Sequence, residues 1–167
     1  MISGTGSGSG KTTVTAGLMR ALAGRLCAKA GREIVPFKCG PDYIDPMFHR
    51  FACGSPSVNL DTVLLGDDGT RRAFNNRMAG RGPGACAIVE GAMGLYDGQR
   101  DTGKGSAADT AVLLDLPVFL IIDGRGMSQS AAALVGGFRD YDPRVRISGI
   151  IVNRIKNESH YRLLSEI

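Results

Sequence analysis

A glycine-rich stretch near the start of the chain has the residue types that bind a triphosphate. The stretch 4–13 reads Gly-Thr-Gly-Ser-Gly-Ser-Gly-Lys-Thr-Thr. Its glycines let backbone N–H groups approach phosphate oxygens, and a helix beginning directly after them aims its positive dipole end at the same place. Lys11 supplies a charge for the β- and γ-phosphates, and Thr12 supplies a hydroxyl for Mg²⁺. We therefore predict a P-loop with nucleotide contacts from Gly6, Ser7, Gly8, Ser9, Gly10, Lys11, Thr12 and Thr13.

The spacing of this loop departs from the standard P-loop pattern by one residue. Counted back from Lys11, the first glycine of the standard pattern falls at Thr5, so that Gly4 makes the loop one residue longer. A flexible Gly/Ser linker is the competing interpretation. The strand stub before the loop, the Lys-Thr-Thr after it and the helical pattern beyond favour the P-loop.

Two predicted strands end in an acidic residue, as a metal site requires. Glu90 follows the apolar residues 87–89, and Asp123 follows 120–122. In open α/β sheets ligands gather at the carboxyl ends of strands, and carboxylates are suitable ligands for Mg²⁺. A helix cap or a turn contact is the alternative for each. We favour metal binding for Glu90 and leave both interpretations open for Asp123.

A second dense segment, 37–46, combines acidic residues with a lysine and a tyrosine. Lys38, Asp42, Tyr43 and Asp45 follow or end a predicted strand. A turn rich in Pro and Asp would explain the prolines and the acids, but it would not explain the lysine and the tyrosine. This segment is therefore the expected second half of the site.

Short apolar runs alternate with amphipathic stretches along the chain. The predicted strands are 1–2, 33–38, 85–89, 118–122 and 147–152. The predicted helices are 12–30, 46–52, 68–79, 106–116, 128–138 and a final one from 158 onward. Apolar strands separated by helices indicate an α/β fold of the P-loop NTPase type, with a mostly parallel sheet and helices on both faces.

The first of these helices directly follows the glycine-rich loop. Val14, Leu18, Leu22 and Leu26 are spaced to form its apolar face, and Gly31 is its expected end. The helix would therefore connect the phosphate site to the core.

Composition narrows the class of protein. The chain has 167 residues, 43% of them hydrophobic and 22% charged, which suits one soluble globular domain. The net charge of +4 comes without a dense basic run, so we expect no nucleic-acid partner. The four cysteines and two histidines, His49 and His160, form no zinc pattern. With no membrane-length apolar run and no signal peptide, we expect no membrane partner and a cytoplasmic protein.

Several longer blocks resemble those of the cobyrinic acid a,c-diamide synthase family. They are residues 37–46, 59–61, 90–98, 105–110, 123–130 and 149–154. The wider superfamily includes dethiobiotin synthetase, whose P-loop shares the extra residue. The resemblance covers essentially the whole chain and implies a dethiobiotin synthetase-like fold.

The resemblance implies an ATP-dependent carbon–nitrogen ligase of cobalamin biosynthesis. Such an enzyme amidates the a and c carboxylates of cobyrinic acid through an acyl phosphate, with ATP and Mg²⁺ as cofactors and ammonia from glutamine. Residues 1–167 would be part of the ATP-binding synthetase domain. The implied partners are the corrinoid substrate and a carboxy-terminal glutamine amidotransferase domain, normally in the same chain; a homodimer is left open. We expect that domain to lie outside residues 1–167, so no cysteine is nominated as its nucleophile.

The same resemblance implies roles for individual residues. It implies a metal environment of Thr12, Asp45 and Glu90. It implies catalytic roles for Lys11, Lys38, Asp45 and Asp97. It implies substrate contacts from Asp42, Tyr43 and Ser106. Asn153 would contact adenine, with a simple turn at the end of a strand as the equal alternative.

Two related functions remain open from the sequence alone. One is a synthetase that amidates another tetrapyrrole, such as nickel sirohydrochlorin. The other is a partitioning or metal-delivery switch ATPase of the same superfamily. Those ATPases carry an extra lysine early in the P-loop, where this chain has Gly6.

Overall fold

Strands and helices alternate along the chain in the computed structural model, which describes residues 1–30 and 33–166; side chains of residues 25–30 lie outside that description. The strands are β1 (Ile2–Gly4), β2 (Ile34–Cys39), β3 (Val58–Leu60), β4 (Cys86–Glu90), β5 (Val118–Asp123) and β6 (Ile147–Asn153). The helices are α1 (Lys11–Ala30), α2 (Asp45–Cys53), α3 (Gly66–Met78), α4 (Ala107–Leu113), α5 (Ser130–Tyr141) and α6 (Glu158–Ser165). The predicted helix end, Gly31, lies outside the described residues.

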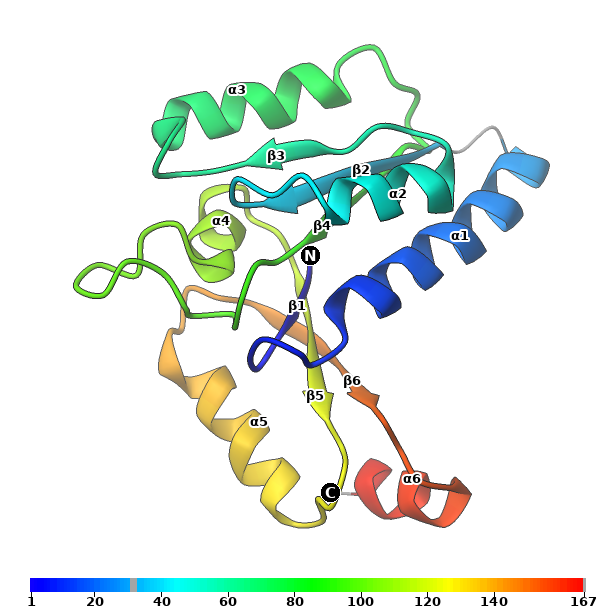
Figure 1. Ribbon diagram of the computed structural model, residues 1–167, viewed down its shortest axis with the longest axis vertical. Helices are drawn as coiled ribbons and strands as arrows, with labels where there is room; N and C mark the ends of the chain where they lie inside the picture. Colours follow the sequence, from blue (N-terminus) through cyan, green and yellow to red (C-terminus); the bar gives the residue numbers. More distant parts are fainter. Residues whose placement is uncertain (31–32, 167) are drawn as a thin grey trace.

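The described strands form one sheet in the order β3-β2-β4-β1-β5-β6, and its paired neighbours are parallel (Figure 1). Glu90 on β4 is level with Lys38 on β2 and with Ile2 on β1. Since β1 runs directly into the glycine-rich loop, this register brings Lys38 and Glu90 to the base of that loop. The predicted parallel sheet is confirmed.

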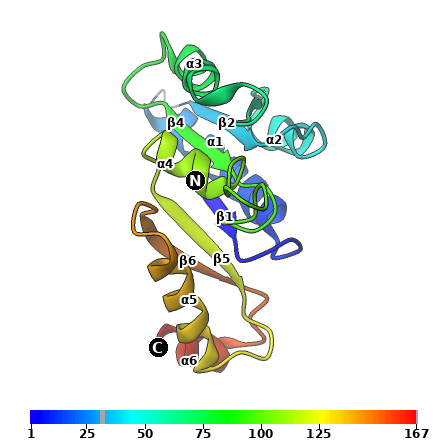
Figure 2. The same cartoon turned by 90° about the vertical axis from the view of Figure 1, so that its left-hand side faces the viewer.

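Helices cover both faces of the sheet (Figure 2). On one face, Met19 of α1 and Ala52 of α2 belong to an apolar cluster with Ile34, Ile88 and Ile121 of the sheet. On the other face, α3, α4 and α5 pack against a larger cluster built on β2, β4 and β5. Successive strand residues enter opposite clusters, as the alternation of side chains along a strand requires. The predicted helical layers are thus confirmed.

Two differences from the sequence-based expectation have clear physical causes; helix α5, predicted at 128–138, is also displaced, to Ser130–Tyr141. Strand β3 was not predicted, because it has only three residues and only Leu60 among them is buried. It is a strand because it pairs with β2. Helix α4 is shorter than the predicted 106–116: Ser106 is its cap, and Asp115, with a φ of 48°, has left the helical conformation.

The buried face of α1 also differs from the predicted one. Val14 and Leu22 do contact the core, but Leu18 is 36% exposed, and Met19 is fully buried in its place. A spacing of four residues drifts around a helix of 3.6 residues per turn, so position 19 faces the sheet better than position 18. The side chain of Leu26 lies outside the described part. No described helix is both long and apolar enough to cross a membrane.

Candidate nucleotide and metal site

The glycine-rich loop between β1 and α1 is shaped by glycines that no other residue replaces easily. Gly8 and Gly10 have φ values of 77° and 96°, in the left-handed region. A Cβ atom on Gly10 would lie 2.2 Å from Nδ2 of Asn153, and one on Gly4 would lie 2.2 Å from Oγ of Ser9. Ser9 itself is buried, and its hydroxyl has no hydrogen-bond partner. A close backbone loop with an unused buried hydroxyl fits a ligand rich in phosphate oxygens.

Lys11 lies against this loop. Its Nζ donates a hydrogen bond to the carbonyl oxygen of Gly6 at 3.0 Å, and the residue is only 8% exposed. Burial lowers the pKa of Lys11, and the nearby charge of Lys38 lowers it further, while nearby carboxylates, among them Glu90, oppose the shift. The ammonium is thus held over the loop where a phosphate chain would need a cation. Thr13, by contrast, is exposed on α1, and its predicted nucleotide contact stays a prediction.

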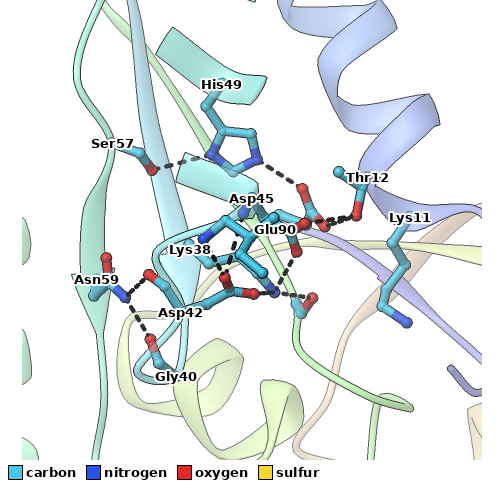
Figure 3. Close-up of polar contacts among 12 residues, drawn as sticks. Lys11, Thr12, Lys38, Gly40, Asp42, Asp45, His49, Ser57, Asn59 and Glu90 are labelled. Atoms are coloured by element: carbon cyan, nitrogen blue, oxygen red, sulfur yellow. Dashed lines mark hydrogen bonds and ion pairs between the residues drawn. The ribbon is translucent and has the colours of Figure 1, made fainter. Parts of the chain in front are cut away.

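Three oxygen-bearing side chains meet at the start of α1 (Figure 3). Thr12 Oγ1 donates a hydrogen bond to Oε1 of Glu90 at 2.9 Å and lies 3.2 Å from Oδ1 of Asp45. Glu90 ends β4, and Asp45 is the first residue of α2. Among the described residues no group of three or more His, Cys, Asp or Glu side chains could hold a metal alone. Magnesium usually binds one or two carboxylates together with phosphate oxygens and water, so this donor set fits Mg²⁺ accompanied by a nucleotide.

Glu90 is fully buried and stays ionised through its neighbours. Burial by itself would raise the pKa of its carboxyl. Hydrogen bonds from His49 and Thr12, together with the charge of Lys38, outweigh burial and hold the pKa below its ordinary value. The site therefore keeps a negative charge that attracts a cation.

Lys38 links the two acidic segments. Its Nζ donates to the carbonyl oxygen of Gly91 at 3.0 Å and forms ion pairs with Asp45 at 3.3 Å and Asp42 at 3.8 Å. Asp42 also accepts hydrogen bonds from the backbone N–H of Ile44 and of Asp45, and so organises the start of α2. The structure thus brings together the predicted residues Lys11, Thr12, Lys38, Asp42, Asp45 and Glu90.

Other predicted site residues have other surroundings. Tyr43 is 78% exposed on the loop before α2. Oδ2 of Asp97 accepts a hydrogen bond from the backbone of Gly94 at 2.9 Å, and Oγ of Ser106 accepts one from the backbone of Asp109 at 3.0 Å. Asp97 and Ser106 both line a cavity of about 550 Å³ that no residue of the glycine-rich loop lines. Their expected catalytic and substrate roles stay predictions.

The ends of β5 and β6 carry the two remaining candidates. Nδ2 of Asn153 donates to the carbonyl oxygen of Ser9 at 2.9 Å, so its amide supports the glycine-rich loop; the expected adenine contact stays a prediction. Asp123 forms ion pairs with Arg125 at 2.8 Å and Arg154 at 2.6 Å. This geometry agrees with the interpretation of Asp123 as a residue that holds a turn, since the backbone N–H of Arg125 also donates to Oδ1 of Asp123.

Sequence reasoning gave no role to three residues of this site: His49, Ser57 and Asn59. Nε2 of His49 lies 2.6 Å from Oε2 of Glu90, and Nδ1 lies 3.0 Å from Oγ of Ser57. Nδ2 of Asn59 donates to the carbonyl oxygens of Gly40 and Asp42 and so fixes the loop after β2. The one available signal was that His49 follows Asp45 by four residues, which places both on the same face of a helix.

Comparison with known proteins identifies a matching family and several relatives of this chain. Residues 1–167 match the family described as the CobQ/CobB/MinD/ParA nucleotide binding domain. The cobyrinate a,c-diamide synthase of Methanothermobacter thermautotrophicus is 45% identical over 162 residues, which are 96% of this chain and 34% of that protein. The synthase of the same name from Gloeobacter violaceus is 44% identical over 167 residues, 99% of this chain and 35% of that protein.

A third relative, from Salmonella typhimurium, carries the same name and is 43% identical over 165 residues, 98% of this chain and 34% of that protein. The chain therefore spans about a third of the length of the curated relatives it matches. The match to the family, in contrast, covers every residue of the chain. This chain belongs to the family of CobQ/CobB/MinD/ParA nucleotide binding domains.

Proposed function

We propose that this chain is the ATP-binding part of a cobyrinate a,c-diamide synthase. One observation carries the proposal: the Thr12 hydroxyl lies between the carboxylates of Glu90 and Asp45, directly after a loop shaped for phosphates. P-loop NTPases hold Mg²⁺ with a Ser or Thr of the loop and a carboxylate, so this arrangement supports phosphoryl transfer from Mg-ATP. The names of the relatives supply the substrate, cobyrinate.

In the proposed reaction a carboxylate of the corrinoid attacks the γ-phosphorus of ATP and becomes an acyl phosphate, with ADP as the leaving group. Ammonia released from glutamine then displaces phosphate and leaves an amide. The backbone of the glycine-rich loop and Lys11 would hold the phosphates and offset their charge. Thr12, Asp45 and Glu90 would hold Mg²⁺, which neutralises charge on the phosphate oxygens. No side-chain nucleophile is needed.

Lys38 has a particular place in this proposal. It is buried and already paired with Asp42 and Asp45, on the strand next to Glu90. A substrate carboxylate at this place would compete with those two carboxylates for the ammonium. Lys38 would then bring the negatively charged substrate close to the negatively charged γ-phosphate, a repulsive approach that needs a cation between them.

The test is ADP release by the protein with Mg-ATP and ammonia, with and without cobyrinic acid. We expect release to depend on the corrinoid, and the product to carry the mass change of two amidations. Release that requires nickel sirohydrochlorin instead would move the substrate to another tetrapyrrole. Release that ignores both macrocycles and rises with a protein partner would support a switch ATPase and contradict the proposal.

A further inference from the structure

His49 is a buried histidine whose two ring nitrogens both have polar neighbours. Its side chain is 0% exposed, in the middle of α2. Nε2 lies 2.6 Å from Oε2 of Glu90, and Nδ1 lies 3.0 Å from Oγ of Ser57. An ionised carboxylate only accepts hydrogen bonds, so Nε2 carries a hydrogen and donates it. The separation is slightly below the range of about 2.7–2.9 Å usual for N–H···O hydrogen bonds to ionised groups, which are the strong ones.

This contact divides the two oxygens of Glu90 between two helices. Oε2 is held by His49 of α2, and Oε1 accepts from Thr12 of α1 (Figure 3). With Oε2 occupied, rotation of the carboxylate about its last bond would break a buried hydrogen bond. Oε1 therefore stays on the side of Thr12 and of the glycine-rich loop, where a cation would bind.

Helix α2 carries both His49, which clamps the carboxylate of Glu90, and Asp45, a second carboxylate of the site. Asp45 begins the helix, and His49 comes one turn later on the same face. Asp45 lies 3.2 Å from the Thr12 hydroxyl, and His49 holds Glu90, whose other oxygen accepts a hydrogen bond from the same hydroxyl. One rigid helical turn thus sets the positions of both acidic groups. Ser57, just before β3, fixes the ring from the other side.

We propose that His49 is a positioning residue for a divalent cation at Glu90, Asp45 and Thr12. It acts through Glu90 and does not touch the cation. The inference rests on the proposed function only in so far as that function places Mg-ATP at this site. The competing explanation is a buried histidine that contributes to stability alone.

Two substitutions at position 49 separate these explanations. The amide nitrogen of glutamine reaches about as far from the backbone as Nε2 does, so His49→Gln keeps a donor for Glu90. Asparagine reaches only as far as Nδ1, so His49→Asn keeps a partner for Ser57 and leaves Glu90 unclamped. The matched control is His160→Asn, the same substitution at the other histidine, whose Nε2 lies 2.8 Å from the carbonyl oxygen of Met127 and whose ring has no contact with Glu90.

The measurement is the Mg²⁺ concentration that gives half-maximal binding of a fluorescent ATP analogue, with metal-free binding and the unfolding temperature recorded alongside. We expect His49→Asn to raise this concentration by about 10- to 100-fold, as loss of groups that orient metal ligands commonly does. His49→Gln should restore it to near the wild-type value, and His160→Asn should leave it unchanged. A folded His49→Asn protein with the wild-type Mg²⁺ requirement would overturn the proposal.

A second variant keeps the proposal testable if His49→Asn does not fold. Ser57→Ala leaves the imidazole in place but removes the group that fixes its orientation. We expect a rise of about 2- to 5-fold in the half-saturating Mg²⁺ concentration, below the range for direct removal of the clamp. An unchanged Mg²⁺ requirement in Ser57→Ala would contradict the proposal. Since neither experiment contains a corrinoid, their outcome is independent of whether corrinoid amidation is found.

Discussion

Two acidic residues of this chain occupy equivalent places in the sequence pattern and different places in the molecule. Glu90 ends β4 and Asp123 ends β5, the two strands that flank β1. Glu90 is fully buried between α1 and α2, whereas the Asp123 side chain is 27% exposed and pairs with Arg125 and Arg154. The same strand-end acid thus serves a buried site in one case and a surface turn in the other.

The register of the sheet explains the difference. Glu90 is level with Ile2, two residues before β1 reaches Gly4 at the start of the loop. On the other side of β1, Gly4 pairs with Ile121, so Asp123 extends two residues beyond that level. At about 3.3 Å per residue, the two acids are offset by about 13 Å along the strands. Glu90 therefore lies level with the strand that leads into the glycine-rich loop, and Asp123 lies about four residues further along the strands.

The sharpest test of this comparison removes the charge of each acid in turn. We expect Glu90→Gln to reduce Mg-ATP-dependent ADP release by at least about 100-fold, the effect typical of losing a group that stabilises transition-state charge. Asp123→Asn should change it by less than about 5-fold, because an exposed ion pair is worth at most about 1 kcal/mol. Full activity in Glu90→Gln would remove Glu90 from the metal site.

The buried cation Lys38 and the exposed cation Arg125 should also differ in how much each contributes to the free energy of unfolding. Lys38→Met keeps the aliphatic stem but leaves Asp42 and Asp45 without their cation, and we expect a loss of about 3 kcal/mol in the free energy of unfolding. Arg125→Ala, which removes an exposed partner of Asp123, should cost less than about 1 kcal/mol. Urea unfolding of both variants gives the values. Equal losses would show that burial does not distinguish the two regions.

Glycines in the loops of the two regions provide a third comparison. Gly10 and Gly126 both have positive φ values, 96° and 67°. A Cβ atom on Gly10 would meet Asn153 at 2.2 Å, while one on Gly126 would meet nothing within 4 Å. We expect Gly126→Ala to cost about 1 kcal/mol of stability for backbone strain alone, and Gly10→Ala about 2–3 kcal/mol because Asn153 must also move. Similar losses in urea unfolding would assign the whole effect to the backbone.

The sequence was sufficient to predict the parts of the fold that local patterns specify. The residue spacing around Gly10 and Lys11 predicted the P-loop, and the apolar runs predicted the parallel sheet. Both patterns are local, because each has its cause within a few residues. Strand β3 could not be predicted in this way. Its three residues, 58–60, form a strand only through their pairing with β2, a contact about twenty residues away.

The residues of the candidate site also divide into those that a local pattern predicts and those that only the packing of the fold brings together. Glu90 was predicted because a strand-end acid beside a P-loop is a local pattern with a known chemical use. His49 was missed because its contact with Glu90 joins residues 41 apart and depends on how α2 packs on the sheet. In the sequence it lies between apolar and basic residues of a short helix, which is the pattern of a surface element. The four-residue spacing from Asp45 was the one local signal, and packing of α2 on the sheet is what makes His49 part of the site.

The smallest expected effect concerns pH, and here too the two acids should differ. The pKa of Glu90 in the folded protein lies below its ordinary value of 4.5, so its ionised form contributes stability above pH 4.5 that is lost as the pH falls through the folded value. The difference in unfolding free energy between wild type and Glu90→Gln should therefore be constant from about pH 5 to 7 and shrink below about pH 4.5. The pKa of Asp123 is also lowered, by hydrogen bonds from Arg125 and Arg154, but these two arginines are exposed. Added salt should therefore abolish the pH dependence of the difference in unfolding free energy between wild type and Asp123→Asn. The pH dependence of the difference for Glu90→Gln should remain. Urea unfolding across this pH range at low and high salt measures both. A difference for Glu90→Gln that grows in acid would mean that burial outweighs His49, Thr12 and Lys38, and that Glu90 takes up a proton before the protein unfolds.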